Sequence, residues 1–460
     1  MPTNEMTTMP AVWLTSRLRW LAVVAIAAAS SFASHRACLG QANVEVEIEH
    51  LWRLHDEGKW LEALDETKPL LALMEKNGAD EGGPLADTFL TFCVFRATFA
   101  SEAGDLEVAR EILELIADLS ANRAFTTAVR RARPAEGRNN DDAAKKRLRQ
   151  YELVVDLRNF YLIDAQIRTA LANQDYAAAE NLVATSIRAR RASGSRAAML
   201  EKKNREGRIL SPKQLAELST FQPHRQATLL YLAKDQSSRA KTYFDNMTED
   251  VEQTIFEAFH DTSQTGTGDN TLCPEWPSGA QPPSVQQREA SRLRALTEDT
   301  RGRLALAHGD LAGAETAFTA ALDYWKQAYG GDHPEAIPAM LGSAEISLKR
   351  VREASSSRDA KTYAVRARKA ERLLKTAQQV AEPALASASP VFRQIGDLLA
   401  EAEELASAST VNFDDLEAAE QAATAALRSM AKFVVSQQSV AASPATPKSA
   451  PSQAAAADKD

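Results

Sequence analysis

Residues 301–340 carry the clearest alternation of apolar and polar positions in the chain. The apolar positions follow a helical period that is interrupted at Gly309-Asp310 and ends at Gly330-Gly331, after which Pro334 opens another apolar segment. Glycine ends helices, and proline is tolerated in a first helical turn. The pattern therefore predicts a helix, a tight turn, a second helix and then a third.

Small residues recur in this stretch where two helices would touch. The set consists of Gly302 in the first helix and of Ala314, Phe318 and Ala321 in the second. This spacing resembles the tetratricopeptide repeat, which places a small residue in its first helix and two alanines around a large apolar residue in its second. The link at residues 329–334, and Gly342 placed 40 residues after Gly302, resemble the longer kinesin-light-chain variety.

The same offsets occur a second time near the N-terminus. Ala97, Gly104 and Ala109 are spaced like Gly302, Gly309 and Ala314, and the weaker copies lie at residues 58–64 and 175–183. Alanine is abundant and β-branched residues are sparse, which favours helix over sheet. The resemblance implies an all-α, helical-hairpin repeat solenoid, either continuous or in two segments.

Composition divides the chain into regions. Residues 262–287 contain glycines and prolines without a helical period, and they are predicted to be a linker between helical regions at 44–261 and 288–435. Residues 436–460 are rich in Ser, Ala, Pro and Gln and are expected to be a disordered tail, because they cannot bury enough apolar surface to fold.

The first 42 residues have the layout of a secretory signal peptide. Arg17 and Arg19 precede an apolar run at residues 20–29, and small residues suggest cleavage after Ala33 or Ala42. The run is shorter than the roughly 20 residues that a membrane-spanning helix needs. We expect an exported protein, periplasmic or secreted, without a membrane span after cleavage; an uncleaved N-terminal anchor is the alternative.

After cleavage at Ala42, Cys93 and Cys273 are the cysteines left in the chain. One hypothesis is that they form a disulfide with each other in an oxidising compartment. The alternative is that Cys93, which lies in an apolar helical segment, is a small core residue.

The net charge of −8 gives an acidic surface, which argues against nucleic acid as the partner. Two basic stretches run against this balance, at residues 123–149 and 188–208. They support a polyanion binder as an alternative hypothesis, although aromatic residues are almost absent from them.

Sequence motifs for catalysis or metal binding are missing. The chain has no His-Glu-x-x-His or Cys-x-x-Cys spacing, no glycine-rich phosphate loop and no Gly-x-Ser-x-Gly elbow. We therefore predict no metal or cofactor and no enzymatic activity. An exported enzyme with an unrecognised site in the helical domain is an alternative hypothesis.

The resemblance implies a function in protein interaction. In tetratricopeptide proteins the first helices line a concave groove that takes a peptide. By that resemblance, the outward positions Asp299, Arg303 and Ser343 are expected to line such a groove. The hypothesis is an exported scaffold for a protein or peptide ligand.

Overall fold

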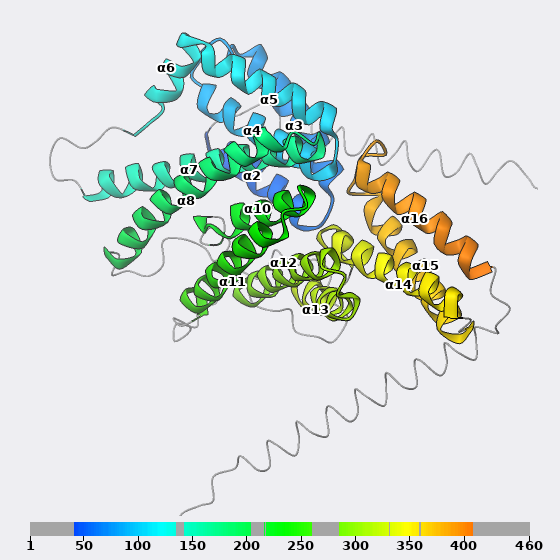
Figure 1. The fold of residues 1–460 in the computed structure, drawn as a ribbon. Helices are drawn as coiled ribbons and strands as arrows, with labels where there is room; N and C mark the ends of the chain where they lie inside the picture. The colour runs from blue at the N-terminus through cyan, green and yellow to red at the C-terminus, as the bar shows by residue number, and fades with distance from the viewer. Residues whose placement is uncertain are drawn as a thin grey trace, which may run out of the picture. The chain divides into compact units, whose positions relative to one another are not determined.

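The computed structural model describes residues 41–134, 142–203, 216, 218–259, 285–330, 332–357 and 360–407 (Figure 1). These residues form α-helices and one short 3-10 helix, and none of them lies in a strand. The prediction of an all-α fold is confirmed. No helix among the described residues has the length and apolar character needed to cross a membrane.

The described residues divide into two compact units. The first comprises those within 1–346 and 373–399, and the second those within 347–372 and 400–460. Three helices contribute to both units: α14 (Ile337–Ser357), α15 (Ala360–Ala381) and α16 (Pro390–Ser407). In the second unit, Val351, Ala367 and Ala406 form a small apolar core.

The first unit is built from helical hairpins. They are α2 (Gln41–Asp56) with α3 (Trp60–Lys76), α4 (Ala86–Ala103) with α5 (Leu106–Ala121), α7 (Asp142–Ala172) with α8 (Tyr176–Lys203), α10 (Phe221–Ala233) with α11 (Ser237–Phe259), and α12 (Val285–Ala307) with α13 (Leu311–Tyr329). The short α6 (Arg123–Arg131) follows the second hairpin, and the 3-10 helix η1 (Pro334–Ala336) follows the fifth. Neighbouring hairpins pack on one another through α3 and α4, α4 and α7, α8 and α10, and α11 and α12.

All five hairpins turn with the same backbone geometry. One residue in each turn has a positive φ, namely Gly58, Gly104, Gln174, Asp235 and Gly309. The amide that follows it donates to the carbonyl five residues back, at 2.8 to 2.9 Å in every case. This bond satisfies a carbonyl at the end of the first helix, as in a Schellman motif.

An alanine follows each turn at the same distance. Ala63, Ala109, Ala179, Ala240 and Ala314 each come five residues after the positive-φ residue, and each is 0 % exposed. A small side chain at this position lets the second helix approach the first closely. The predicted repeats near residues 58, 104, 175 and 309 coincide with hairpins, and the structure adds the hairpin that turns at Asp235.

The ring of Phe318 lies so close to Gly302 on α12 and to Gly342 on α14 that neither position has room for a side chain. This ring is fully buried, and a Cβ atom added at Gly302 would lie 2.8 Å from its Cδ1 atom. A Cβ atom at Gly342 would overlap the ring even more closely. Ala97 and Ala321 are fully buried as well. A repeat-packing role for these residues stays a prediction, and the exposed turn residue Gly309 is one at which an added Cβ atom would meet nothing within 4 Å.

The chain after the fifth hairpin returns to the first two. The Nε2 atom of His333 donates to the carbonyl of Asp56 at 3.2 Å, and Pro334 packs against Gly58 in the first turn. The amide of Ala386 donates to the carbonyl of Ala103 at 2.9 Å. These contacts connect the ends of α2 and α4 to segments that lie hundreds of residues later in the sequence.

Several predictions fall on residues outside the described part of the chain. Residues 1–40 of the predicted signal peptide and the tail at 436–460 lie there, as does Cys273. Most of the predicted linker lies there too, but residues 285–287 begin α12, which packs against α11. Cys93 is buried, and burial raises the pKa of its thiol to about 12, so that it stays protonated.

Candidate functional site: a charged cavity lined by the first helices

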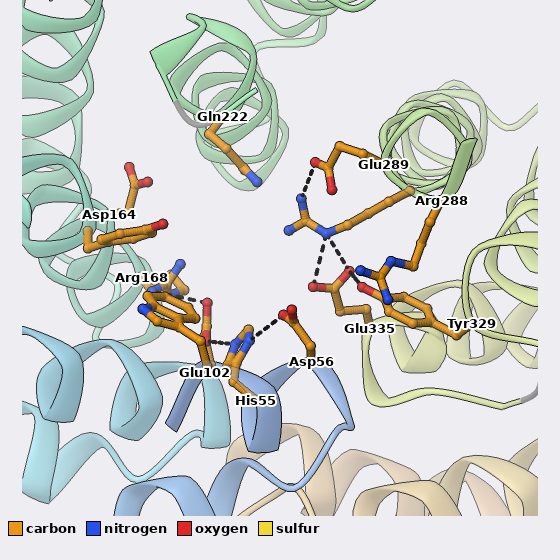
Figure 2. Close-up of a pocket in the computed structure, with 13 residues that line it drawn as sticks. His55, Asp56, Glu102, Asp164, Arg168, Gln222, Arg288, Glu289, Tyr329 and Glu335 are labelled. Carbon is orange, nitrogen blue, oxygen red and sulfur yellow. Dashed lines mark hydrogen bonds and ion pairs between the residues drawn. The ribbon is translucent and has the colours of Figure 1, made fainter. Parts of the chain in front are cut away.

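A cavity of about 70 Å³ lies among the first helices of the five hairpins (Figure 2). Side chains from α2, α4, α7, α10 and α12 line it, together with Tyr329, the last residue of α13, and Glu335 of η1. The volume is enough for several waters or for the end of one polar side chain.

His55 is the centre of the first charged group. Its Nε2 atom donates to Glu102 Oε2 at 2.6 Å, and its Nδ1 atom lies 3.5 Å from Asp56 Oδ1. The rings of Trp60 and Phe99 stack on the imidazole at centroid distances of 5.8 and 5.5 Å. His55 is the penultimate residue of α2 and Glu102 that of α4, so that both stand at the same end of neighbouring first helices.

The charges of this group reinforce one another. Burial lowers the pKa of His55, but the carboxylates of Glu102 and Asp56 outweigh it and raise that pKa to about 9. Burial also raises the pKa of Glu102, and the cationic His55 and Arg168 overcome this and lower it to about 2. Arg168 Nη2 lies 3.5 Å from Glu102 Oε1. Both partners of the His55–Glu102 pair are therefore charged at neutral pH.

A second charged group comes from α12 and the link after α13. Arg292 donates from Nε to Glu335 Oε2 at 2.9 Å and from Nη1 to Glu289 Oε1 at 3.1 Å. Burial raises the pKa of Glu335, but the charge of Arg292 and its hydrogen bonds to this carboxylate outweigh it, and the net shift is downward. Figure 2 shows the carboxylates of Glu289 and Glu335 on this side of the cavity.

His333, next to this group, is neutral. Its Nδ1 atom accepts from the amide of Glu335 while its Nε2 atom donates to Asp56, and its ring stacks on Tyr329 at 3.7 Å. Burial lowers the pKa of His333 to about 4 despite the nearby Glu335. Burial likewise raises the pKa of the Tyr329 phenol well above its ordinary value.

Asp164 on α7 carries an acceptor that no group in the described chain uses. Its Oδ2 atom accepts from Arg190 Nη2 at 2.5 Å, whereas its Oδ1 atom is buried without a hydrogen-bond partner there. Asp164 is 4 % exposed and lines the cavity. A buried acceptor without a donor is destabilising, so a donor that reached this atom would stabilise the protein.

The lining of the cavity consists mainly of charged and aromatic side chains. The described residues that line the cavity include no Ser, Thr, Cys or Lys, and hence none of the usual side-chain nucleophiles apart from carboxylates, His and Tyr. The described residues also contain no cluster of His, Cys, Asp and Glu that would hold a metal ion. With its charges paired internally, the cavity offers fixed donors and acceptors to a polar guest.

The residues expected to line a peptide groove lie elsewhere. Asp299 and Ser343 are each 2 % exposed, so that our expectation of outward-facing side chains is wrong for both. Asp299 accepts from Arg303, one turn further along α12, at 3.3 Å. It also accepts from Arg225 at 3.3 Å, because α10 packs against α12. Arg303 is partly exposed and also donates to the carbonyl of Pro338 at 3.3 Å. Their contact with a peptide stays a prediction.

Sequence reasoning missed the cavity residues, although one signal for them exists. Residues 86–103 form a largely apolar helix, in which Glu102 is an isolated acid near the end. A charge that is buried in such a helix needs a partner. Neither the position of that partner, His55, nor the convergence of five helices can be deduced from periodicity.

The chain matches no protein-family model, and no curated protein matches it. The class of protein is thus defined by its fold, an all-helical stack of hairpins with a common turn geometry.

Proposed function

We propose that this chain is an exported, tetratricopeptide-like scaffold that binds a protein or peptide ligand with the face formed by its first helices. The observation that carries the proposal is that the first helices of all five hairpins contribute side chains to one cavity. Stacked hairpins of the tetratricopeptide kind use this face for ligands. Export rests on the predicted signal peptide at residues 1–42.

The cavity would receive one polar side chain of the ligand while the surrounding helices contact its flanking residues. Asp164 Oδ1 offers an acceptor, and Arg168 offers an Nη2 atom that is buried without a hydrogen-bond partner in the described chain. A ligand group with both a donor and an acceptor, such as an amide, would satisfy both atoms. Satisfying them is favourable because neither atom has a hydrogen-bond partner in the described chain.

The proposal can be tested with a substitution that fills the cavity and leaves its ion-paired residues unchanged. Gln222 lines the cavity on α10, and Gln222→Trp would occupy the space with an indole. Gln379→Trp is the matched control, because Gln379 is exposed on α15 and does not line the cavity. Both variants are made in the full chain, and circular dichroism verifies that they fold.

Partners are captured from the exported fraction of the cell, and their affinities are then measured with purified components. We expect a partner that binds the parent and the control alike and binds Gln222→Trp at least about tenfold more weakly. Equal binding by all three proteins would refute the use of this face. Retention of the chain inside the cell would refute export.

An exported enzyme is the second candidate. The observation in its favour is the convergence of titratable side chains with displaced pKa values, as in many active sites. However, the pKa values of His55 and Glu102 are displaced away from neutrality, whereas general acid–base catalysis needs a pKa near the working pH. Binding is therefore the better supported function.

A further inference from the structure

A second and larger cleft lies on α8, α10 and α11, and it shares no lining residue with the inner cavity. It has a volume of about 640 Å³. Buried side chains of α10, His224 and Tyr231, form part of its lining, and the exposed Arg188, Arg191 and Arg239 stand around them. We call this feature the α8–α11 cleft.

Positive charge dominates the α8–α11 cleft. Its lining contains these three arginines and one carboxylate, that of Glu180. Glu180 already accepts from the hydroxyl of Tyr231 and from Nζ of Lys234, both at 2.7 Å. These two hydrogen bonds lower its pKa and hold the carboxylate in place. The exposed Arg188 and Arg239 are therefore accessible to an anion from outside.

The guanidinium groups are accessible. Arg239 is 63 % exposed, and its Nη1 atom lies 3.8 Å from Glu180 Oε1, beyond hydrogen-bonding distance. Arg188 donates to the Thr185 hydroxyl at 3.4 Å, which is a weak contact between exposed groups. Guanidinium groups bind carboxylates in a bidentate manner, with charge-assisted hydrogen bonds.

The remaining lining favours a peptide over a nucleic acid. Binding of single-stranded nucleic acid depends on aromatic faces that are open to the bases. Tyr231 is only 5 % exposed, and its ring stacks on Tyr243 at 5.3 Å. Ala184 and Ile187 add an apolar surface beside the arginines, which suits an apolar side chain between acidic ones.

We propose that the α8–α11 cleft binds an acidic peptide segment of a partner protein, with Arg188 and Arg239 as the principal anchors. The proposal assigns a specific place to part of the basic stretch at 188–208. It is independent of the inner cavity, which would bind its own ligand.

The test uses fluorescence anisotropy with a labelled peptide of glutamates around one phenylalanine. The full chain is compared with Arg188→Glu/Arg239→Glu. The control variant is Arg110→Glu/Arg131→Glu, which makes the same change in net charge at exposed arginines that do not line the cleft. Inorganic phosphate and a single-stranded oligonucleotide serve as competitors, and circular dichroism verifies folding.

We expect the parent and the control to bind the peptide with similar affinity and the cleft variant to bind at least about tenfold more weakly. Absence of binding by the parent would overturn the proposal. Equal weakening of both variants would overturn it too, because it would indicate a diffuse charge effect. Stronger binding of the oligonucleotide or of phosphate than of the peptide would replace the peptide with that anion.

Discussion

The contact between Phe318 and Gly342 can be tested by adding a single methyl group. In an exposed helix, Gly→Ala stabilises a protein by up to about 1 kcal/mol, because alanine has the higher helix propensity. At Gly342 the added Cβ atom would lie less than 3.0 Å from three atoms of the Phe318 ring. The ring is 0 % exposed, and closely packed interiors leave little room for a side chain to move.

Overpacking of this kind costs about 1–3 kcal/mol, which exceeds the gain in helix propensity. Gly342→Ala should therefore destabilise the protein. Gly396→Ala is the matched control, because Gly396 lies in α16 and a Cβ atom there would meet nothing within 4 Å. The control should be as stable as the parent or slightly more stable.

The assay is urea denaturation monitored by helical circular dichroism. A double-mutant cycle with Phe318→Leu isolates the contact, since the smaller side chain relieves the overlap. We expect Gly342→Ala to be destabilising in the parent and close to neutral in the Phe318→Leu background, a coupling of about 1–3 kcal/mol. If Gly342→Ala stabilised the parent as Gly396→Ala does, the packing of Phe318 between the two glycines would be refuted.

Two further predictions concern the titration of His55 and His333 and the contact of Gly58 with Pro334. His55 has a folded-state pKa of about 9 against an ordinary value of 6.5, so its contribution to stability is fully present below pH 6.5 and is lost as the pH rises through 9. His333 has a folded-state pKa of about 4, so its contribution is present above pH 6.5 and is lost as the pH falls toward 4. Urea midpoints measured from pH 4 to 10 should decline toward both ends of this pH range. We expect His55→Gln to remove part of the alkaline decline and His333→Gln to remove part of the acidic decline. Midpoint profiles that the substitutions leave unaltered would contradict these assignments. Gly58 and Gly309 have φ values of 76° and 75°, but a Cβ atom at Gly58 would lie 2.6 Å from Pro334 Cδ, whereas at Gly309 it would meet nothing within 4 Å. Each Gly→Ala change costs about 1–2 kcal/mol for the left-handed backbone, and we expect Gly58→Ala to lower the unfolding midpoint further than Gly309→Ala; equal midpoints would show that the contact with Pro334 does not contribute.

The helical hairpins were predictable because local features encode them. Gly104-Asp105 and Gly309-Asp310 combine a left-handed glycine with an aspartate whose side chain accepts from the first turn of the next helix. The alanine five residues later marks the close approach of the two helices. These features act over a few residues, and a single sequence displays them.

Two of the five turns lack the glycine, which made one of them harder to predict and left the other unpredicted. Gln174 and Asp235 adopt φ values of 59° and 54°, in a region that side chains other than Gly, Asn and Asp rarely enter. At position 174 the residue type, Gln, does not indicate a left-handed backbone, and at position 235 aspartate tolerates this backbone without requiring it. The α10–α11 hairpin was therefore not predicted as a repeat.

The candidate sites were decided by the tertiary structure. The contact of His333 with Asp56 spans 277 residues, and it depends on the rotations between successive hairpins, which no local pattern specifies. The same rotations cover Asp299 and bring His55 to Glu102. By itself, the sequence determined the helices, the tight turns and the small residues at the helix contacts. The charged cavity and the α8–α11 cleft exist only because stacked helices bring distant side chains together.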